Sequence, residues 1–237
     1  MMGHTHALSG AAAWLAAAPL LTSESLLGSF AVELSPAQLA AGTAVCAGAA
    51  LLPDLDHHDG SIANTFGPVT QILCKGVNKI SGGHRHATHS LLFVLAMGLG
   101  TQALANYAKY AWWVILLITV GMGLRALGIG FREKHYVTGL LNGFLAVALV
   151  FLMRDLDMGY AGWAVGLGCL AHIVGDCLTP QGCPLLWPAP WRMGLPVVGT
   201  TNGKIENFVV APLLSVVILV FIVQSAVGDE ITGWLTS

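Results

Sequence analysis

Long intervals without a charged residue constrain the fold of this chain more than any other feature of its sequence. They occur at residues 1–23, 34–53, 86–108, 110–124, 135–153, 158–175 and 207–228. An α-helix needs about 20 mostly apolar residues, within a range of roughly 17–25, to cross the hydrocarbon core of a bilayer. Five of the seven intervals fit this length comfortably. The first is less apolar because it contains Gly-His-Thr-His, and the fourth is shorter than a membrane span requires. We therefore predict an all-α, polytopic membrane bundle with about five to seven transmembrane helices.

The overall composition agrees with a membrane protein. Only 9% of the 237 residues are charged and 55% are hydrophobic, whereas about a quarter of a soluble domain is charged. The net charge of −2 gives no reason to expect a nucleic-acid partner. No Lys or Arg precedes the first apolar run, so we expect that run to be retained rather than cleaved as a signal peptide. With no internal repeat and no low-complexity linker, residues 1–237 are predicted to form one domain.

The distribution of basic residues predicts the orientation in the membrane. If all seven intervals cross, the face that carries the N-terminus, here called side A, also receives loops 54–88, 125–134 and 176–206. Side A then holds Lys75, Lys79, Arg85, Arg125, Arg132, Lys134, Arg192 and Lys204, and side B holds Lys109 and Arg154. Because loops rich in Lys and Arg stay in the cytoplasm, side A is predicted to be the cytoplasmic face of the cell's inner membrane.

Two of the loops on side A contain residues that suit the surface of the membrane. Phe66, Val69, Leu73, Val77 and Ile80 recur at helical spacing, which predicts a short amphipathic helix lying in the membrane interface. The stretch 179–196 contains five prolines, so we expect irregular structure there. Its tryptophans, Trp187 and Trp191, suit the headgroup region of a bilayer.

Side chains that can bind a metal gather at the side A ends of the predicted helices. They are His4 and His6, Asp54, Asp56 and His57, His84 and His89, His172 and Asp176, and Glu206. A carboxylate or imidazole in a membrane segment is costly unless it is paired, hydrated or bound to a metal, so each is a candidate functional residue. The sequence therefore predicts a site formed by motifs gathered at one membrane face.

The spacing and chemistry of these residues favour a divalent metal. His172 and Asp176 are four residues apart, so both can reach one ion from a single helix face. Asp54, Asp56 and His57 follow Pro53, where a helix is expected to end. Imidazole and carboxylate ligands suit zinc, manganese or iron(II), and we expect zinc, as one or two ions.

Other interpretations of the single residues stay open. An isolated buried histidine is often a hydrogen-bonded core residue, Asp54 and Asp56 could cap a turn, and His172 and Asp176 could neutralise each other. The five cysteines contain no C-x-x-C pair, so a thiolate zinc site or a disulfide framework is not expected. Motifs of serine hydrolases, NTPases and dinucleotide-binding proteins are also missing from the sequence.

Several ordered motifs resemble those of a known family. PDLDH, GHRHATHSLL, HIVGDCLTPQGCPLLWP and RMGLP look like the motifs of the YdjM-type membrane-bound predicted metal-dependent hydrolases, which are described as LexA-regulated in enterobacteria. The resemblance implies functional roles for His6, Asp54, Asp56, His57, His84, Arg85, Thr88, His89, His172, Asp176 and Thr179. His86 stands where the family usually has Gly and is not assigned. The scattered His and Asp residues also resemble zinc-dependent phospholipase C, more loosely.

These observations lead to a functional hypothesis with two alternatives. The chain is predicted to be a metal-dependent hydrolase of a lipid or other membrane-associated phosphoester, with a metal-activated water as nucleophile. Asp54 or Asp176 would act as general base, and Arg85 and Lys204 would hold an anionic phosphate. Thr88, Thr179, Trp187 and Glu206 are the other predicted supporting or substrate-contacting residues. The alternatives are a divalent-metal transporter and a non-catalytic membrane protein with a structural metal site.

Overall fold

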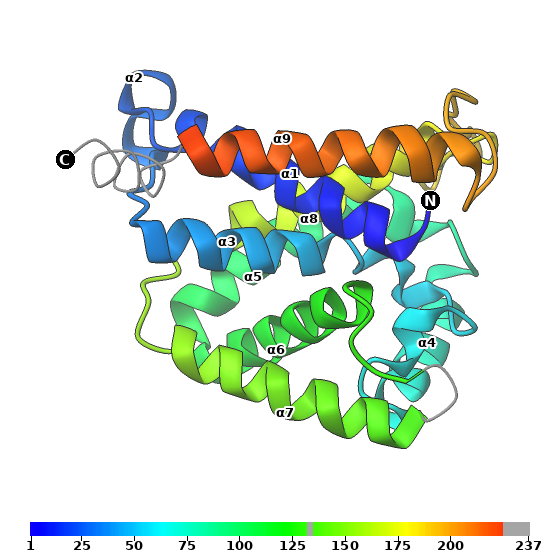
Figure 1. The fold of residues 1–237 in the computed structure, drawn as a ribbon, viewed down its shortest axis with the longest axis horizontal. Helices are drawn as coiled ribbons and strands as arrows, with labels where there is room; N and C mark the ends of the chain where they lie inside the picture. The colour runs from blue at the N-terminus through cyan, green and yellow to red at the C-terminus, as the bar shows by residue number, and fades with distance from the viewer. Residues whose placement is uncertain (132–134, 225–237) are drawn as a thin grey trace.

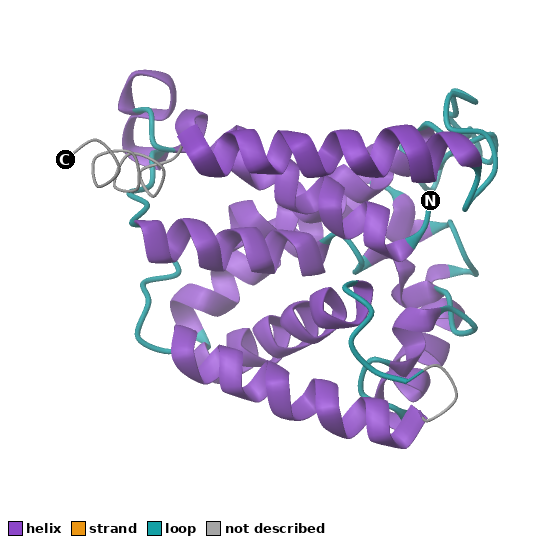
Figure 2. Cartoon of the chain, viewed as in Figure 1, coloured by secondary structure: helices purple, strands orange, loops and turns teal. Residues whose placement is uncertain are grey.

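The computed structural model describes residues 1–131 and 135–224, and this part of the chain contains helices and loops but no β-strand (Figure 2). The long helices are α1 (Gly3–Leu21), α3 (Pro36–Ala49), α5 (Leu91–Tyr107), α6 (Lys109–Ala126), α7 (His135–Met153), α8 (Ala161–Cys177) and α9 (Ala211–Gln224). Shorter elements are α2 (Glu24–Leu27), η1 (Gly28–Phe30), η2 (Pro53–Asp56), η3 (Ser61–Asn64), α4 (Pro68–Ser81), η4 (Ala87–His89) and the π-helical turn η5 (Glu206–Val210). The predicted all-α class is confirmed. Arg132 and Lys134 lie outside the described residues.

Local sequence signals set the ends of the helices that carry the polar motifs. Ser35 and Gln38 form a capping box at the start of α3, in which each side chain bonds the other residue's main-chain N–H. The Ser90 side chain caps α5 by accepting a hydrogen bond from the main-chain N–H of Phe93. At the end of α4, Gly82 adopts a left-handed conformation with φ of 86°, which glycine tolerates without steric cost.

The core forms where α1, α3 and α8 pack against one another through small residues (Figure 1). A Cβ atom at Gly10 of α1 or at Gly168 of α8 would lie 2.5 Å from the carbonyl oxygen of Cys46 on α3. Such close approach of backbones is typical of helix packing in membranes, where small residues allow dispersion contacts along the whole interface. The three helices are therefore held at a separation that only glycine permits at these positions.

The substitution Gly168→Ala is expected to destabilise the fold. The added methyl group collides with main-chain atoms of α3, so we expect a loss of about 1–3 kcal/mol, the usual cost of overpacking. Gly100→Ala in α5 is the matched control because its Cβ would meet no atom within 4 Å. Thermal unfolding of the purified variants in detergent checks this, and equal midpoints for the two variants would contradict the packing described here.

Three helical segments of the described chain are long and apolar enough to cross a membrane: Pro36–Asp56, Tyr136–Met153 and Glu206–Gln224. Helices α5 and α8 are apolar but shorter. Helix α9 has no buried residue, and large apolar side chains such as Leu213 and Leu219 are exposed along it. This surface suits contact with lipid. The expected total of five to seven crossings stays a prediction.

The amphipathic helix predicted from the sequence forms as α4, at the end of the bundle where the N-terminus lies (Figure 1). Its exposed face differs in part from the predicted one. Val69 and Ile80 are exposed as expected, but Phe66 and Val77 pack against the core. The proline-rich stretch after α8 contains no helix, as predicted.

Candidate metal centre

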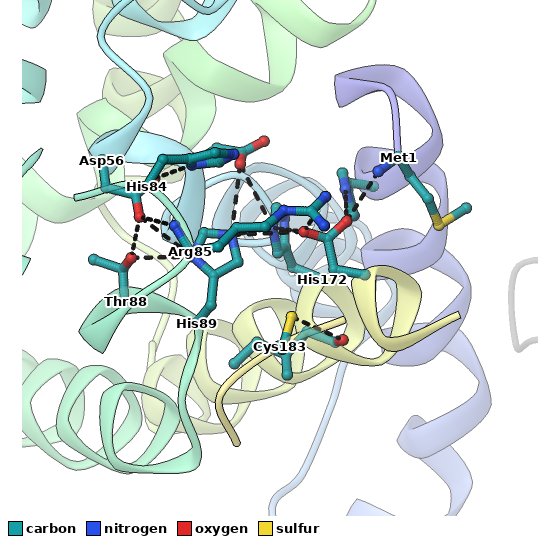
Figure 3. Close-up of polar contacts among 12 residues, drawn as sticks. Met1, Asp56, His84, Arg85, Thr88, His89, His172 and Cys183 are labelled. Carbon is teal, nitrogen blue, oxygen red and sulfur yellow. Dashed lines mark hydrogen bonds and ion pairs between the residues drawn. The ribbon is translucent and has the colours of Figure 1, made fainter. Parts of the chain in front are cut away.

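Five separate segments bring histidine and aspartate side chains together at one end of the bundle (Figure 3). We call this group the histidine–aspartate cluster; it comprises His6 of α1, Asp54 and Asp56 of η2, His84 from the loop after α4, His89 of η4, and His172 and Asp176 of α8. These residues are far apart in the sequence, so only the fold can bring them into contact. All seven are among the ligands predicted from the sequence.

Two imidazole nitrogens face each other at the centre of the cluster. His89 Nε2 lies 3.2 Å from His172 Nε2. Oδ1 of Asp54 is 3.7 Å from each of these nitrogens, and Oδ2 of Asp176 is 3.6 Å from each. The two nitrogens thus share a carboxylate oxygen on either hand, and nitrogen and oxygen donors of this kind suit zinc, manganese or iron(II).

The tautomers of the two histidines are set by what their other ring nitrogens contact. Nδ1 of His172 lies 2.7 Å from the carbonyl oxygen of Ala50, and because a carbonyl only accepts, Nδ1 carries the hydrogen. Its Nε2 then presents a lone pair to the centre of the cluster. Nδ1 of His89 faces the hydroxyl of Thr88 at 3.1 Å and a carboxylate oxygen of Asp56 at 3.4 Å. Partners of this kind fix the orientation of metal-binding histidines.

A hydrogen on Nε2 of His89 accounts for the short contact between the two histidines, since Nε2 of His172 presents a lone pair. Burial lowers the pKa of His89, but hydrogen bonds with the carboxylates of Asp54 and Asp56 outweigh it and raise the pKa to about 9. A proton on His89 Nε2 can then be donated to the lone pair of His172 Nε2. Because metal ligands bind in their deprotonated form, a cation at this position would take the place of that proton. The residues present therefore fit a metal ion.

Asp56 orients much of the cluster. Its Oδ1 lies 2.7 Å from Nδ1 of His84. Its Oδ2 accepts hydrogen bonds from the Thr88 hydroxyl, at 2.6 Å, and from the main-chain N–H of Arg85, at 2.9 Å. Arg85 has a φ of 60°, in the left-handed region that non-glycine residues rarely adopt, and this hydrogen bond helps to hold it there. Asp56 is also close enough to Asp54, His84 and His89 to join a cation itself.

The candidate ligands form three overlapping groups rather than one. One group is Asp54, Asp56, His84 and His89, a second is His6, Asp54 and His172, and a third is His89, His172 and Asp176. The ring of His6 stacks on that of His172 with centroids 3.8 Å apart, and the buried Nδ1 of His6 has no hydrogen-bond partner in the described chain. Overlapping groups that share Asp54 could accommodate two neighbouring ions.

Arg85, predicted to hold an anion, makes an ion pair with a member of the cluster. Its Nη2 lies 2.8 Å from Oδ2 of Asp176, and its Nη1 donates to the hydroxyl of Thr179 at 3.3 Å. The α-amino group of Met1 lies 2.9 Å from Oδ1 of the same aspartate. Thr179 thus contacts the cluster through Arg85 and also directly, because its hydroxyl donates to the main-chain carbonyl of Asp176 at 2.7 Å.

The remaining predicted residues lie at different distances from the cluster. His57 is at its edge, where its ring meets that of His84 at a centroid distance of 4.6 Å. Glu206 is fully buried and accepts hydrogen bonds from the main-chain N–H groups of Met2 and Asn202, so it ties the start of η5 to the start of α1. The structure shows no contact of Trp187 or Lys204 with the cluster among the described residues.

Four contributors were not predicted from the sequence, and one of them is the α-amino group of Met1 that pairs with Asp176. The carbonyl of Ala50 orients His172, the side chain of Asn78 donates to the carbonyl of Asp56 at 2.5 Å, and Arg192 donates to the carbonyl of Arg85 at 3.3 Å. Main-chain groups such as that of Ala50 leave no signal in a sequence. The sequence shows Asn78 as a polar residue of the amphipathic segment and Arg192 as a basic residue of the proline-rich loop, but it does not connect either residue with the site.

One side of the cluster is open to solvent. The side chains of His89, His172, Asp56 and Asp176 are at most 1% exposed, whereas Asp54 is 20% and His84 36% exposed. An ion held by the buried groups would therefore be reached past Asp54 and His84.

Together, the fold and the cluster define an all-helical membrane protein with a candidate metal centre. The family model of the YdjM inner membrane protein matches residues 1–128 and 135–231. The chain therefore belongs to the YdjM inner membrane protein family, which confirms the resemblance that its motifs indicated.

Two relatives illustrate how far the similarity extends. The chain is 28% identical over 160 residues to the inner membrane protein YdjM of Escherichia coli (strain K12), a match that covers 67% of this chain and 56% of that protein. It is 27% identical over 213 residues to the uncharacterized protein YvsG of Bacillus subtilis (strain 168), covering 90% of this chain and 89% of that protein. No solved structure matches this chain.

Loss of a central imidazole is expected to abolish metal binding. His172→Ala removes a donor shared by two of the three ligand groups, so bound metal in the purified protein should fall to near background. His86→Ala is the matched control because His86 is exposed and belongs to none of these groups. Elemental analysis after gel filtration measures the metal-to-protein ratio, and an unchanged ratio in His172→Ala would rule out this centre.

Asp56→Asn tests the orienting role of that carboxylate. The substitution keeps the shape of the side chain but removes its charge and one hydrogen-bond acceptor, so metal affinity should fall about 10–100-fold, as is usual when a partner of metal-binding histidines is lost. Competition with a chelator measures the affinity, and Asp59→Asn, at an exposed position, is the control. Equal affinities in the two variants would contradict the role assigned to Asp56.

Proposed function

We propose that this protein is a membrane-bound, metal-dependent hydrolase that cleaves a phosphoester of a lipid or of another membrane-associated substrate. The observation that carries this proposal is the combination of a buried set of nitrogen and oxygen donors with one accessible side at Asp54 and His84. A structural site fills its coordination positions with protein ligands, whereas a catalytic site keeps one for water or substrate, and the accessible side favours the second kind.

We assign the residues of the cluster distinct roles in this reaction. His6, Asp54, His84, His89, His172 and Asp176 hold one or two divalent ions, zinc in our proposal, and Asp56 and His57 support them. The bound ion supplies Lewis acidity and lowers the pKa of a water molecule toward neutrality. Where it is not fully engaged as a ligand, Asp54 is the better general base of the two predicted carboxylates, because it is accessible while Asp176 is paired with Arg85.

Arg85 is proposed to contribute to substrate binding as well as to the cluster. Its buried Nε has no hydrogen-bond partner among the described residues, which leaves a charged donor for an anionic oxygen. Lys204 and Trp187 remain predicted substrate-contacting residues from the flanking loops. Their exposure suits contact with a lipid headgroup.

The proposed setting is the inner membrane, with five to seven crossings and the site on the cytoplasmic face. Support comes from the apolar helices, the name of the Escherichia coli relative, and the excess of Lys and Arg in the loops on the side of the cluster. Transport is a less favoured function, because transporters usually bind their ions near the bilayer midplane, between repeated halves of the chain.

Hydrolysis can be tested with the purified, metal-loaded protein. A panel of phosphodiesters, phosphomonoesters and phospholipids should contain a substrate that the protein turns over, and Asp54→Asn should lower that rate by at least about 100-fold, the usual contribution of a general base. His86→Ala should retain the full rate. Bound metal without turnover on the whole panel would refute the proposal and favour a structural site, and metal flux into proteoliposomes would favour transport.

A further inference from the structure

Helix α4 turns its apolar side away from the protein. Its apolar stripe, which we define as Val69, Ile72, Leu73 and Ile80, is exposed, with exposed fractions of 70% at Val69, 73% at Ile72 and 88% at Ile80. The side facing the protein instead carries Thr70, Cys74 and Ser81, all buried. In a helix of a soluble protein the apolar side would face the core. The exposed apolar side of α4 therefore suits contact with an apolar environment outside the protein.

Polar contacts on the inner face fix the rotation of α4 about its own axis. The Thr70 hydroxyl donates to the carbonyl of Ala63 in η3 at 2.8 Å. Further along the helix, Asn78 donates to the carbonyl of Asp56 in the histidine–aspartate cluster. Turning the apolar stripe inward would break these bonds and leave buried polar groups without partners. The stripe therefore stays on the outside.

The start of α4 lies beside a segment that can cross the membrane. A Cβ atom at Gly139 would lie 2.8 Å from the main chain of Gly67, the residue that precedes α4. Gly139 belongs to the first turns of the candidate span Tyr136–Met153, whose residues Tyr136 and Leu140 are exposed. The exposed apolar surface of α7 thus begins where α4 begins, and a bilayer around α7 would have its surface at the level of α4 (Figure 1).

Two unpaired cations border the apolar stripe. Lys75 and Lys79 are one helical turn apart, and helical spacing places them along the same edge of the stripe as Ile72. Both are exposed, neither takes part in an ion pair in the described chain, and α4 itself contains no acidic residue. The nearest acidic residue in the preceding loop, Asp59, is paired with His58 at 3.4 Å. An apolar stripe bordered by lysines is complementary to the boundary between acyl chains and anionic headgroups.

We propose that α4 is a docking surface for anionic phospholipids, with the apolar stripe inserted at the acyl boundary and Lys75 and Lys79 bound to headgroup phosphates. Each basic residue near an anionic membrane surface strengthens binding about fivefold, and the stripe adds the larger, charge-independent part. This proposal concerns the contact between α4 and the membrane lipids, and it does not depend on hydrolase activity.

The test places an environment-sensitive fluorophore on α4 of the whole chain in nanodiscs. It is attached at position 72 (Ile72→Cys), or at position 71 (Gln71→Cys) as the matched control on the neighbouring polar edge. Labelling of the unsubstituted chain gives the background, because four of the five native cysteines are buried. Nanodiscs contain either phosphatidylcholine alone or a mixture with phosphatidylglycerol, each with brominated acyl chains as quencher.

We expect quenching at position 72 to exceed that at position 71 severalfold. The difference should grow when phosphatidylglycerol is added, and the growth should be lost in Lys75→Gln/Lys79→Gln. Equal quenching at the two positions would overturn lipid docking, as would efficient crosslinking between two copies through position 72. Quenching at position 72 that is indifferent to phosphatidylglycerol would overturn the preference for anionic headgroups.

Discussion

Three aspartates at the ends of apolar helices impose the constraint on which the rest of this structure depends. A carboxylate removed from water is unstable unless opposite charge, hydrogen-bond donors or a metal compensate it. Asp54, Asp56 and Asp176 meet this requirement together, since His89 contacts all three. The convergence of η2, η4 and α8 is therefore a consequence of burying these charges, and the site and the local fold stabilise each other.

The close packing of α1, α3 and α8 makes this arrangement specific. His6 of α1 and His172 of α8 stack on each other, and both of their helices pack closely on α3, at Gly10 and Gly168. The same approach brings the free carbonyl of Ala50, just beyond the end of α3, to Nδ1 of His172. Small residues in the apolar interior thus determine which imidazole nitrogen faces the candidate metal position.

Asp56 connects this buried centre with the outer surface of the molecule. Its side chain orients His84 and His89, while its carbonyl accepts the hydrogen bond from Asn78 of α4. The position of α4 on the membrane is therefore mechanically linked to the geometry of the centre. In the function proposed above, this link would hold the site at the level of its membrane-associated substrate.

Much of this could be predicted from the sequence because it depends on local patterns. Uncharged intervals of helical length require helices in a bilayer, and the spacing of His172 and Asp176 places both on one helix face. Counting the apolar intervals that cross the membrane assigns each polar motif to one membrane face. This made it possible to predict that His6, Asp54, His84 and His172 lie at the same end of the bundle. The short amphipathic helix predicted from Val69, Leu73 and Ile80 forms as α4, whereas Phe66 precedes the helix and, like Val77, packs against the core.

By itself, then, the sequence determined the all-helical class, the family and the set of candidate ligands from which the histidine–aspartate cluster is drawn. Only the tertiary structure decided the role of each member: that Arg85 pairs with Asp176, that Asp56 orients two histidines, and that the cluster is open at Asp54 and His84. The physical reason is that charge pairing and tautomer choice depend on distances of a few ångströms between segments far apart in the chain. Those distances are set by helix packing and by main-chain groups, which no residue pattern records.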